Sequence, residues 1–228
     1  MPASPKRAGE NRGTGIVRAV VVLVSALVAL PAAAIADRDV ECWSQIQITG
    51  ALSDVVAFTS TVALRHDEDA TRHYYTRMES GLRWNVSKHV AVGAEYAHIN
   101  TRSGGGWALE CRPSVSLTLR WNLGALGLSD RNRLERRVKE SVSSTRYRNQ
   151  LTLKGPQVTP LKLRPYASGE VFSDVSGGRI EKRRVSGGVT LETWRPLAIS
   201  LYYMLEGRRP DSEWIDVDVF GTTMAYSF

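Results

Sequence analysis

Residues 114–121, SVSLTLRW, decide the fold class, because apolar and polar side chains alternate along them without a break. Successive side chains of a β-strand point to opposite faces, whereas the residues on one face of a helix recur every three or four positions. The same alternation returns in residues 77–86, RMESGLRWNV, and in residues 197–205, LAISLYYML. The sequence therefore predicts an all-β protein.

The polar face of several predicted strands is too heavily charged for the core of a soluble sandwich, since unpaired charges are costly in an apolar interior. Residues 131–137 read RNRLERR. A water-lined lumen tolerates such a face, so we expect an antiparallel transmembrane β-barrel of ten to twelve strands. The side chains that we expect to line its lumen are Arg131, Arg133, Glu135, Arg137, Arg146, Arg148, Glu170 and Arg184. The alternation places further charges on the same inner face, namely Arg77, Glu79, Arg83, Glu95, Arg120 and Glu192.

Aromatic residues also favour a barrel in the cell outer membrane. Trp84, Trp121 and Trp194 stand at predicted strand ends, where the aromatic girdle of a barrel lies. The chain ends in FGTTMAYSF, an alternating strand whose last residue, Phe228, is aromatic. Such an end is similar to the assembly signal of outer-membrane barrels. We therefore expect three partners: outer-membrane lipid, lipopolysaccharide, and the barrel-assembly machinery.

The predicted connections alternate between two lengths. Short ones lie near residues 85–88, 122–125, 155–161 and 195–196, and longer polar ones near 66–73, 100–107, 139–145, 174–179 and 208–213. Barrels place short turns on the periplasmic side and longer loops outside. Counting from residue 55 gives ten strands, and residues 42–49, CWSQIQIT, would add an eleventh. Strand numbers are usually even, so this segment is either a capping piece or one of twelve strands.

The first 36 residues form a predicted signal peptide, which leaves residues 37–228 as the barrel. Residues 1–18 are basic, residues 19–30 read AVVVLVSALVAL, and an A-x-A site ends at Ala36. The alternative is an uncleaved anchor, but the 18 uncharged residues of 19–36 are at the lower limit for a span. Export would expose Cys42 and Cys111 to an oxidising compartment, and our hypothesis is that a disulfide between them ties the N-terminal segment to the barrel; the sequence leaves open whether they pair.

The charge balance excludes some partners. The formal net charge of the 228 residues is +7, and residues 1–36 hold four basic residues against Glu10, which is +3. The remaining +4 is mild for so long a segment, so we expect no nucleic-acid partner. No motif indicates a metal or another cofactor.

The mature chain resembles the bacterial family known as domain of unknown function 2490, whose members are thought to be outer-membrane barrels. The resemblance rests on Trp43, the stretch DRNRLERR at 130–137, TRYRNQLTL at 145–153, the residues around Pro165 and Glu170, and Arg184 followed by Gly187-Gly188. The cysteine pair is not a feature that we associate with the family. The resemblance implies the fold and the location, and it implies no activity.

Three functional interpretations stay open. The charged lumen is either an interlocked plug of Arg and Glu or a narrow path that prefers anions, since Arg outnumbers Glu and suits phosphate and carboxylate. The first alternative is an enzyme that acts on lipid A or phospholipid, with His98, Asn100 and Ser103 on the outer wall. The second is a soluble periplasmic β-protein that binds a ligand. We favour a non-enzymatic barrel.

Overall fold

The computed structural model describes residues 40–68, 70–158, 162–194, 196–210 and 212–228, and the predicted signal peptide, residues 1–36, lies outside them. The described residues form eleven strands. They are β1 (Val40–Ala51), β2 (Val56–Asp67), β3 (Arg72–Asn85), β4 (Val90–Ser103), β5 (Gly106–Leu123), β6 (Leu126–Lys139), β7 (Ser143–Lys154), β8 (Leu163–Asp174), β9 (Arg179–Trp194), β10 (Leu197–Arg208) and β11 (Ile215–Ser227). The all-β prediction is confirmed.

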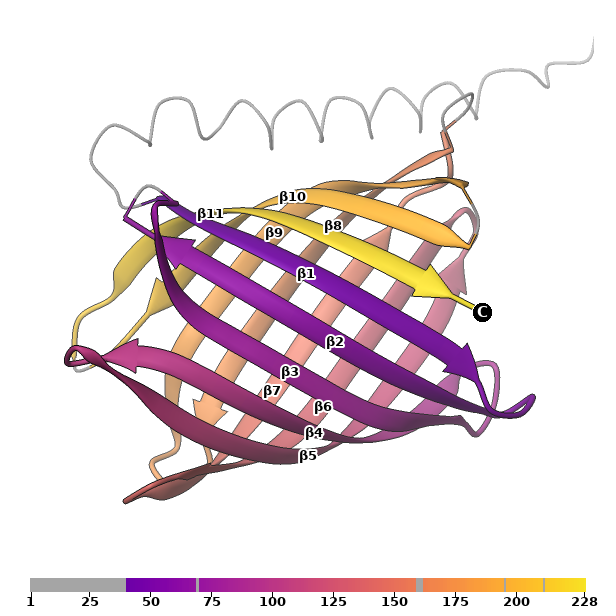
Figure 1. Cartoon of the computed structure of the whole chain (residues 1–228). Helices are drawn as coiled ribbons and strands as arrows, with labels where there is room; N and C mark the ends of the chain where they lie inside the picture. Colours follow the sequence, from indigo (N-terminus) through magenta and orange to yellow (C-terminus); the bar gives the residue numbers. More distant parts are fainter. Residues whose placement is uncertain (1–39, 69, 159–161, 195, 211) are drawn as a thin grey trace, which may run out of the picture.

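The strands close into one barrel in sequence order, with β1 beside β11 (Figure 1). Every consecutive pair is antiparallel, but β1 and β11 run parallel, from Val40 opposite Asp218 to Thr49 opposite Ser227. This geometry corrects the expectation of ten or twelve strands. Strands that alternate in direction leave the first and the eleventh pointing the same way, so an odd barrel closes through one parallel pair. The segment 42–49 belongs to β1, which is a full strand paired on both sides.

The two sets of connections lie at opposite ends of the barrel, as predicted. The prediction that one set is longer than the other is wrong. At the end where β1 begins, which we call the entry end, the connections are 68–71, 104–105, 140–142, 175–178 and 209–214. At the opposite end, where the chain ends, they are 52–55, 86–89, 124–125, 155–162 and 195–196. Strand pairing continues into the segments expected as loops. The pairing of β4 with β5 reaches Ser103 and Gly106, because Gly104 and Gly105 take positive φ angles of 57° and 87° and turn the chain in two residues.

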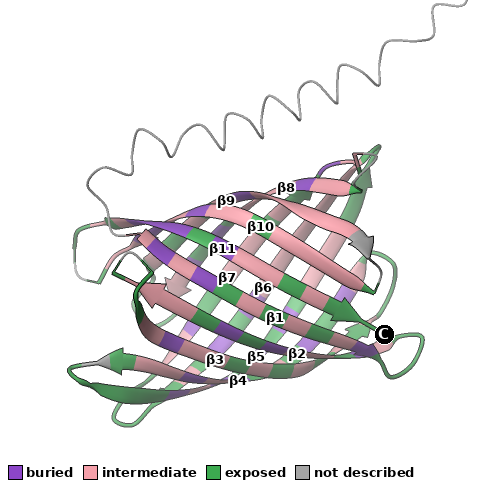
Figure 2. Cartoon of the chain, turned by 45° about the horizontal axis from the view of Figure 1, so that its top comes forward, coloured by how far each residue is buried: buried purple, intermediate pink, exposed green. Residues whose placement is uncertain are grey.

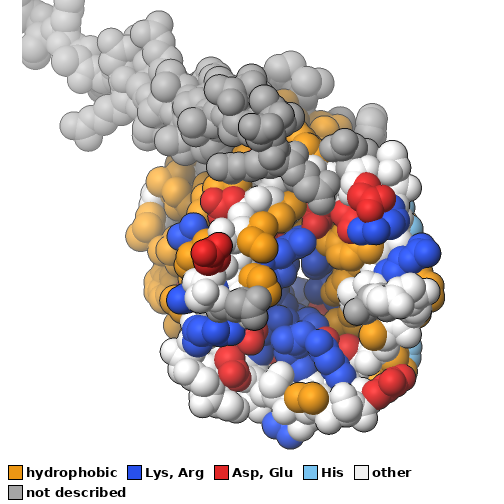
Figure 3. All heavy atoms as spheres, turned by 90° about the vertical axis from the view of Figure 1, so that its left-hand side faces the viewer, with side chains coloured by type: hydrophobic (Ala, Val, Ile, Leu, Met, Phe, Trp, Pro, Cys, Tyr) orange, Lys and Arg blue, Asp and Glu red, His pale blue; other side chains and the backbone are white. Residues whose placement is uncertain are grey.

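The barrel is apolar outside and charged inside, as the alternation predicts, and Figure 3 shows Lys and Arg side chains gathered inside its entry end. Figure 2 shows how buried and exposed residues are distributed along the strands. Large apolar side chains stand exposed on the outer wall, among them Ile46, Phe58, Met78, Leu82, Trp84, Val115, Trp121, Leu134, Leu201 and Phe220. Glu135 and Glu206, by contrast, are fully buried on the inner face. A soluble protein has the reverse arrangement, so this is the architecture of a transmembrane barrel. No helix of the described residues is long and apolar enough to cross a membrane.

The predicted disulfide is wrong for this fold. Cys42 lies on β1, in register with His66 and Phe220, and Cys111 lies on β5, in register with His98. Strands β2, β3 and β4 stand between them. Neighbouring strands are about 4.8 Å apart, whereas a disulfide needs Cα atoms within about 7 Å. Both cysteines are free thiols in the structure.

We expect two reactive thiols per chain when the unreduced protein is denatured and labelled with a maleimide. The Cys111→Ser variant should then label once. A wild-type protein that labels only after reduction would contradict the separation of β1 from β5.

The pair Gly187-Gly188 lies in β9, and Gly188 allows close packing against β10. A Cβ atom at Gly188 would lie 2.4 Å from the backbone oxygen of Leu201 and 2.8 Å from Cβ of Tyr202. Because a backbone oxygen cannot rotate away, the substitution Gly188→Ala should destabilise the barrel by about 1–3 kcal/mol.

The matched control is Gly169→Ala in β8, because no atom lies within 4 Å of the Cβ built there. Unfolding in urea, followed by the loss of the fast-migrating folded band on an unboiled gel, measures both variants. Equal stability of the two variants would rule out the packing constraint at Gly188.

Candidate functional site

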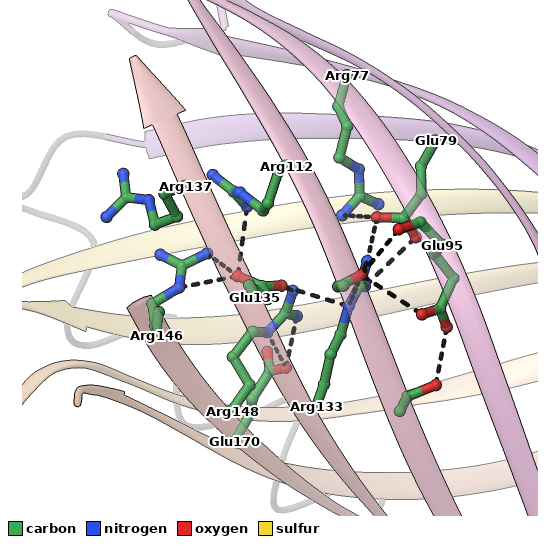
Figure 4. A network of polar contacts seen from close by, with 12 residues as sticks. Arg77, Glu79, Glu95, Arg112, Arg133, Glu135, Arg137, Arg146, Arg148 and Glu170 are labelled. Atoms are coloured by element: carbon green, nitrogen blue, oxygen red, sulfur yellow. Dashed lines mark hydrogen bonds and ion pairs between the residues drawn. The ribbon is translucent and has the colours of Figure 1, made fainter. Parts of the chain in front are cut away.

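The strand register brings the eight predicted lumen residues onto one continuous inner face. On β6 and β7 the pairing sets Glu135 opposite Arg146 and Arg133 opposite Arg148. The pairing of β8 with β9 sets Glu170 opposite Arg184. Because side chains on paired positions point to the same side of a sheet, all eight face the lumen. Figure 4 shows most of them meeting in a single polar network.

Glu135 is the centre of this network. It has no exposed surface, and its carboxylate accepts hydrogen bonds from Arg146 at 2.6 Å and from Arg148 at 2.7 Å (Figure 4). Arg133 and Arg112 are also within ion-pair distance, at 3.4 Å and 3.7 Å. One buried carboxylate therefore neutralises part of the charge of four guanidinium groups, which need such partners when they leave water.

Two further glutamates extend the network around the barrel. Glu170 joins Arg148, at 2.6 Å, to Arg184, at 3.0 Å. Arg184 also donates to Glu206, which accepts a hydrogen bond from Lys182 at 2.9 Å. These contacts connect β7, β8, β9 and β10, so the network braces the inner wall as well as filling it.

On the other side of the lumen, Arg133 donates to Glu79 at 2.7 Å, and Arg131 donates to Glu95 at 3.0 Å. Nearer the entry end, Glu110 accepts from Arg112 and from Arg137, at 2.6 Å and 2.9 Å. The predicted Arg137 is therefore part of this network through Glu110.

Sequence reasoning missed several charged residues of the lumen. They are Glu41, Arg65, Glu110, Arg112, Lys182, Glu206 and Arg208. Glu110 and Arg112 share the spacing of two with Ser114 and Ser116, so continuing the alternation from residues 114–121 backward to the start of β5 would have found them. Arg65 shares the spacing of two with Thr59 and Thr61, so the alternation also indicates its inward direction, but its aromatic contacts depend on the neighbours that strand pairing supplies.

Three cavities follow one another along the lumen. The cavity at the entry end measures about 420 Å³, the middle cavity about 290 Å³ and the cavity at the opposite end about 220 Å³. The entry and middle cavities share four lining arginines, which are Arg65, Arg77, Arg148 and Arg184. Figure 3 looks into the entry end and shows Lys and Arg side chains lining a hollow centre.

Some lumen arginines have no carboxylate to neutralise them. Arg65 and Arg83 make no ion pair with another described residue, and Arg120 donates only to the amide oxygen of Asn85, at 3.3 Å. Nε of Arg77 and Nε of Arg83 are buried without a hydrogen bond in the part of the chain that the structure describes. The lumen therefore keeps an excess of positive charge after the Arg–Glu pairs are made.

The structure places the side chains of two of the three residues of the lipid-enzyme hypothesis, His98 and Asn100, on the same strand, β4. His98 faces the outer wall from β4, in register with Met78 and Cys111. No hydrogen bond joins its ring to another described side chain. The side chain of Ser103 lies outside the described atoms.

Comparison with known proteins gives a family and no activity. A family model described as "Protein of unknown function (DUF2490)" matches residues 40–213. No curated protein matches the chain. Among solved structures, LpxR from Salmonella typhimurium is similar with a TM-score of 0.45 and 10% identity, over 75% of this chain and 83% of that chain. The siderophore receptor PirA from Pseudomonas aeruginosa has a TM-score of 0.28 and 16% identity, over 69% of this chain and 32% of that chain. Neither likeness says what this chain does.

We expect Glu135→Gln to destabilise the barrel by about 3–5 kcal/mol, because it leaves buried guanidinium groups without their shared carboxylate. Urea unfolding in detergent micelles measures this loss. The control is Glu192→Gln, since the pair of Glu192 with Arg164 is 24% and 33% exposed and should contribute less than about 1 kcal/mol. If both variants lose the same stability, Glu135 is not the centre of the network.

Proposed function

The chain belongs to the DUF2490 family of proteins of unknown function, and from the architecture of its lumen we propose that it is a non-enzymatic outer-membrane barrel that gives small anionic solutes a narrow path. The path runs between the entry end, which faces the outside of the cell, and the end that carries the C-terminus. The excess of lumen arginine over glutamate is the observation that carries this proposal.

The outer wall supports the location. Its exposed apolar side chains match the acyl chains of a bilayer, and Trp84 and Trp121 lie near strand ends, where aromatic side chains meet the lipid headgroups. On the proposed orientation, outer-membrane lipid and lipopolysaccharide surround this wall. The final strand β11 presents Phe220, Met224 and Phe228 outward, each at least 40% exposed, as the face offered to the barrel-assembly machinery.

The pairing of charges supports a path in preference to a complete plug. Where the Arg–Glu network is dense, around Glu135 and Glu170, side chains fill one side of the lumen. Elsewhere the three cavities are continuous in their lining, since the middle cavity shares Arg65 with the entry cavity and Arg131 with the cavity at the opposite end. Arginines without carboxylate partners line this route. A positive potential within low-dielectric walls concentrates anions.

The proposal predicts anion-selective conductance. The protein, extracted from the outer-membrane fraction and inserted into a planar bilayer, should show a reversal potential in a KCl gradient that indicates a preference for chloride over potassium. The double variant Arg83→Gln, Arg120→Gln removes two positive charges that have no carboxylate partner near one mouth, so it should reduce that preference while the barrel still forms.

The matched control is Arg136→Gln. Arg136 donates to Ser143 and Thr145 and shares the outward spacing of Leu134, so its charge is outside the lumen. It should leave the reversal potential unchanged. Cation preference in the wild type, or a protein found only in the periplasmic fluid, would overturn the proposed function.

A further inference from the structure

Arg65 lines both the entry cavity and the middle cavity, in a setting unlike that of the arginines that are paired with glutamates. Strand pairing places Trp43 of β1 directly opposite it on one side and Tyr75 of β3 directly opposite it on the other. Its Cζ atom is 3.6 Å from the centre of the Trp43 ring and 4.1 Å from the centre of the Tyr75 ring. Two aromatic rings from neighbouring strands therefore hold one guanidinium group by cation–π contact.

The aromatic residues are themselves fixed. The indole Nε1 of Trp43 donates to Glu41 at 2.8 Å, and the hydroxyl of Tyr74 donates to the same carboxylate oxygen at 2.6 Å. Trp43 and Tyr75 are each only 8% exposed. Of the two rings that contact Arg65, Trp43 is therefore held by a hydrogen bond and by burial, and Tyr75 by burial.

No carboxylate lies within ion-pair distance of Arg65 among the described residues, and no hydrogen bond to another described residue uses its five N–H donors. Aromatic rings contact the face of a guanidinium group, whereas its N–H bonds lie in its plane. The two contacts therefore leave the donors at the edge, where Arg65 lines both the entry cavity and the middle cavity.

Arg77 supplies a second charge beside Arg65. Since Arg65 is paired with Tyr75, Arg77 is its diagonal neighbour on the inner face of β3, and it lines the same two cavities. It donates to the amide oxygen of Gln45 at 3.2 Å, and its Nε has no hydrogen bond within the described residues. The carboxylate of Glu79 is 3.9 Å from Arg77 and 2.7 Å from Arg133, so these two arginines share one carboxylate.

We propose that Arg65 and Arg77 form a binding site for a phosphate group, held between the entry and middle cavities. Arg65 has no ion pair among the described residues, and Arg77 has only the long one with Glu79. Two adjacent guanidinium groups with so little neutralisation match a dianionic oxyanion better than a monoanion such as chloride or acetate. The flanking cavities, about 420 and 290 Å³, leave room for a small phosphomonoester as well as for inorganic phosphate. This proposal rests on the proposed function. It adds that the solutes selected by the path carry a phosphate group.

The test is calorimetric titration of the folded full chain, in micelles of a phosphate-free detergent, with inorganic phosphate, glycerol 3-phosphate, chloride and acetate at equal ionic strength. Phosphate and glycerol 3-phosphate should bind once per chain and more tightly than chloride or acetate. Arg65→Gln should weaken phosphate binding about tenfold or more, because charge-assisted hydrogen bonds are lost.

Two further variants separate the site from a general effect of charge. Arg65→Lys keeps the charge but cannot stack flat or donate in pairs, so it should also bind phosphate more weakly than the wild type. Arg136→Gln on the outer wall should bind as the wild type does. Migration of the unboiled protein on a gel confirms that each variant is folded.

Undiminished phosphate binding by both Arg65 variants would overturn the site, as would chloride or acetate binding as tightly as phosphate. Binding of phosphatidic acid in the micelles without any binding of free phosphate would show a lipid headgroup site instead. Because titration needs no current, a barrel that binds phosphate through Arg65 but does not conduct would refute the path and keep the site. A barrel that conducts anions, but whose Arg65 variants bind phosphate as the wild type does, would refute the site and keep the path.

Discussion

The rest of the structure depends on the need to neutralise arginines inside a narrow closed barrel. Eleven strands enclose a lumen that side chains largely fill, so the guanidinium groups of the inner face have little water around them. Glu135 answers this need by taking four arginines within 3.7 Å. Its partners come from β5, β6 and β7. The same contacts therefore neutralise the charges and hold these three strands of the wall together.

The odd strand number has a consequence for the centre of the lumen. Parallel closure places β1 between β11 and β2, and Trp43 then faces Arg65 across one pair and Gly221 across the other. The glycine leaves space that the ring of Tyr202 occupies, since a Cβ atom there would lie 1.9 Å from Cζ of Tyr202. The inner wall beside the parallel pair of β1 and β11 is thus lined by aromatic rings, whereas the opposite inner wall is lined by ion pairs. Arg65 lies where these two kinds of wall meet.

The two walls imply different roles for arginines that look alike in the sequence. Arg148 has carboxylates on two sides and is a brace between strands. Arg65 has rings in place of carboxylates, so it is held in position while its charge remains available. A lumen with both kinds can be rigid and still attract anions. This combination is the reason that we propose a selective path and not a plug alone.

The sequence by itself determined the strand alternation, the apolar outer wall and the inward direction of residues such as Arg133 and Arg148, because the two-residue period of a strand is a local property. It also showed that the connections alternate between the two ends of the barrel. Only the tertiary structure decided the strand number, the separation of Cys42 from Cys111 and the rings on either side of Arg65. These depend on which strands become neighbours when the sheet closes, and pairing across distant segments leaves no mark on the local pattern.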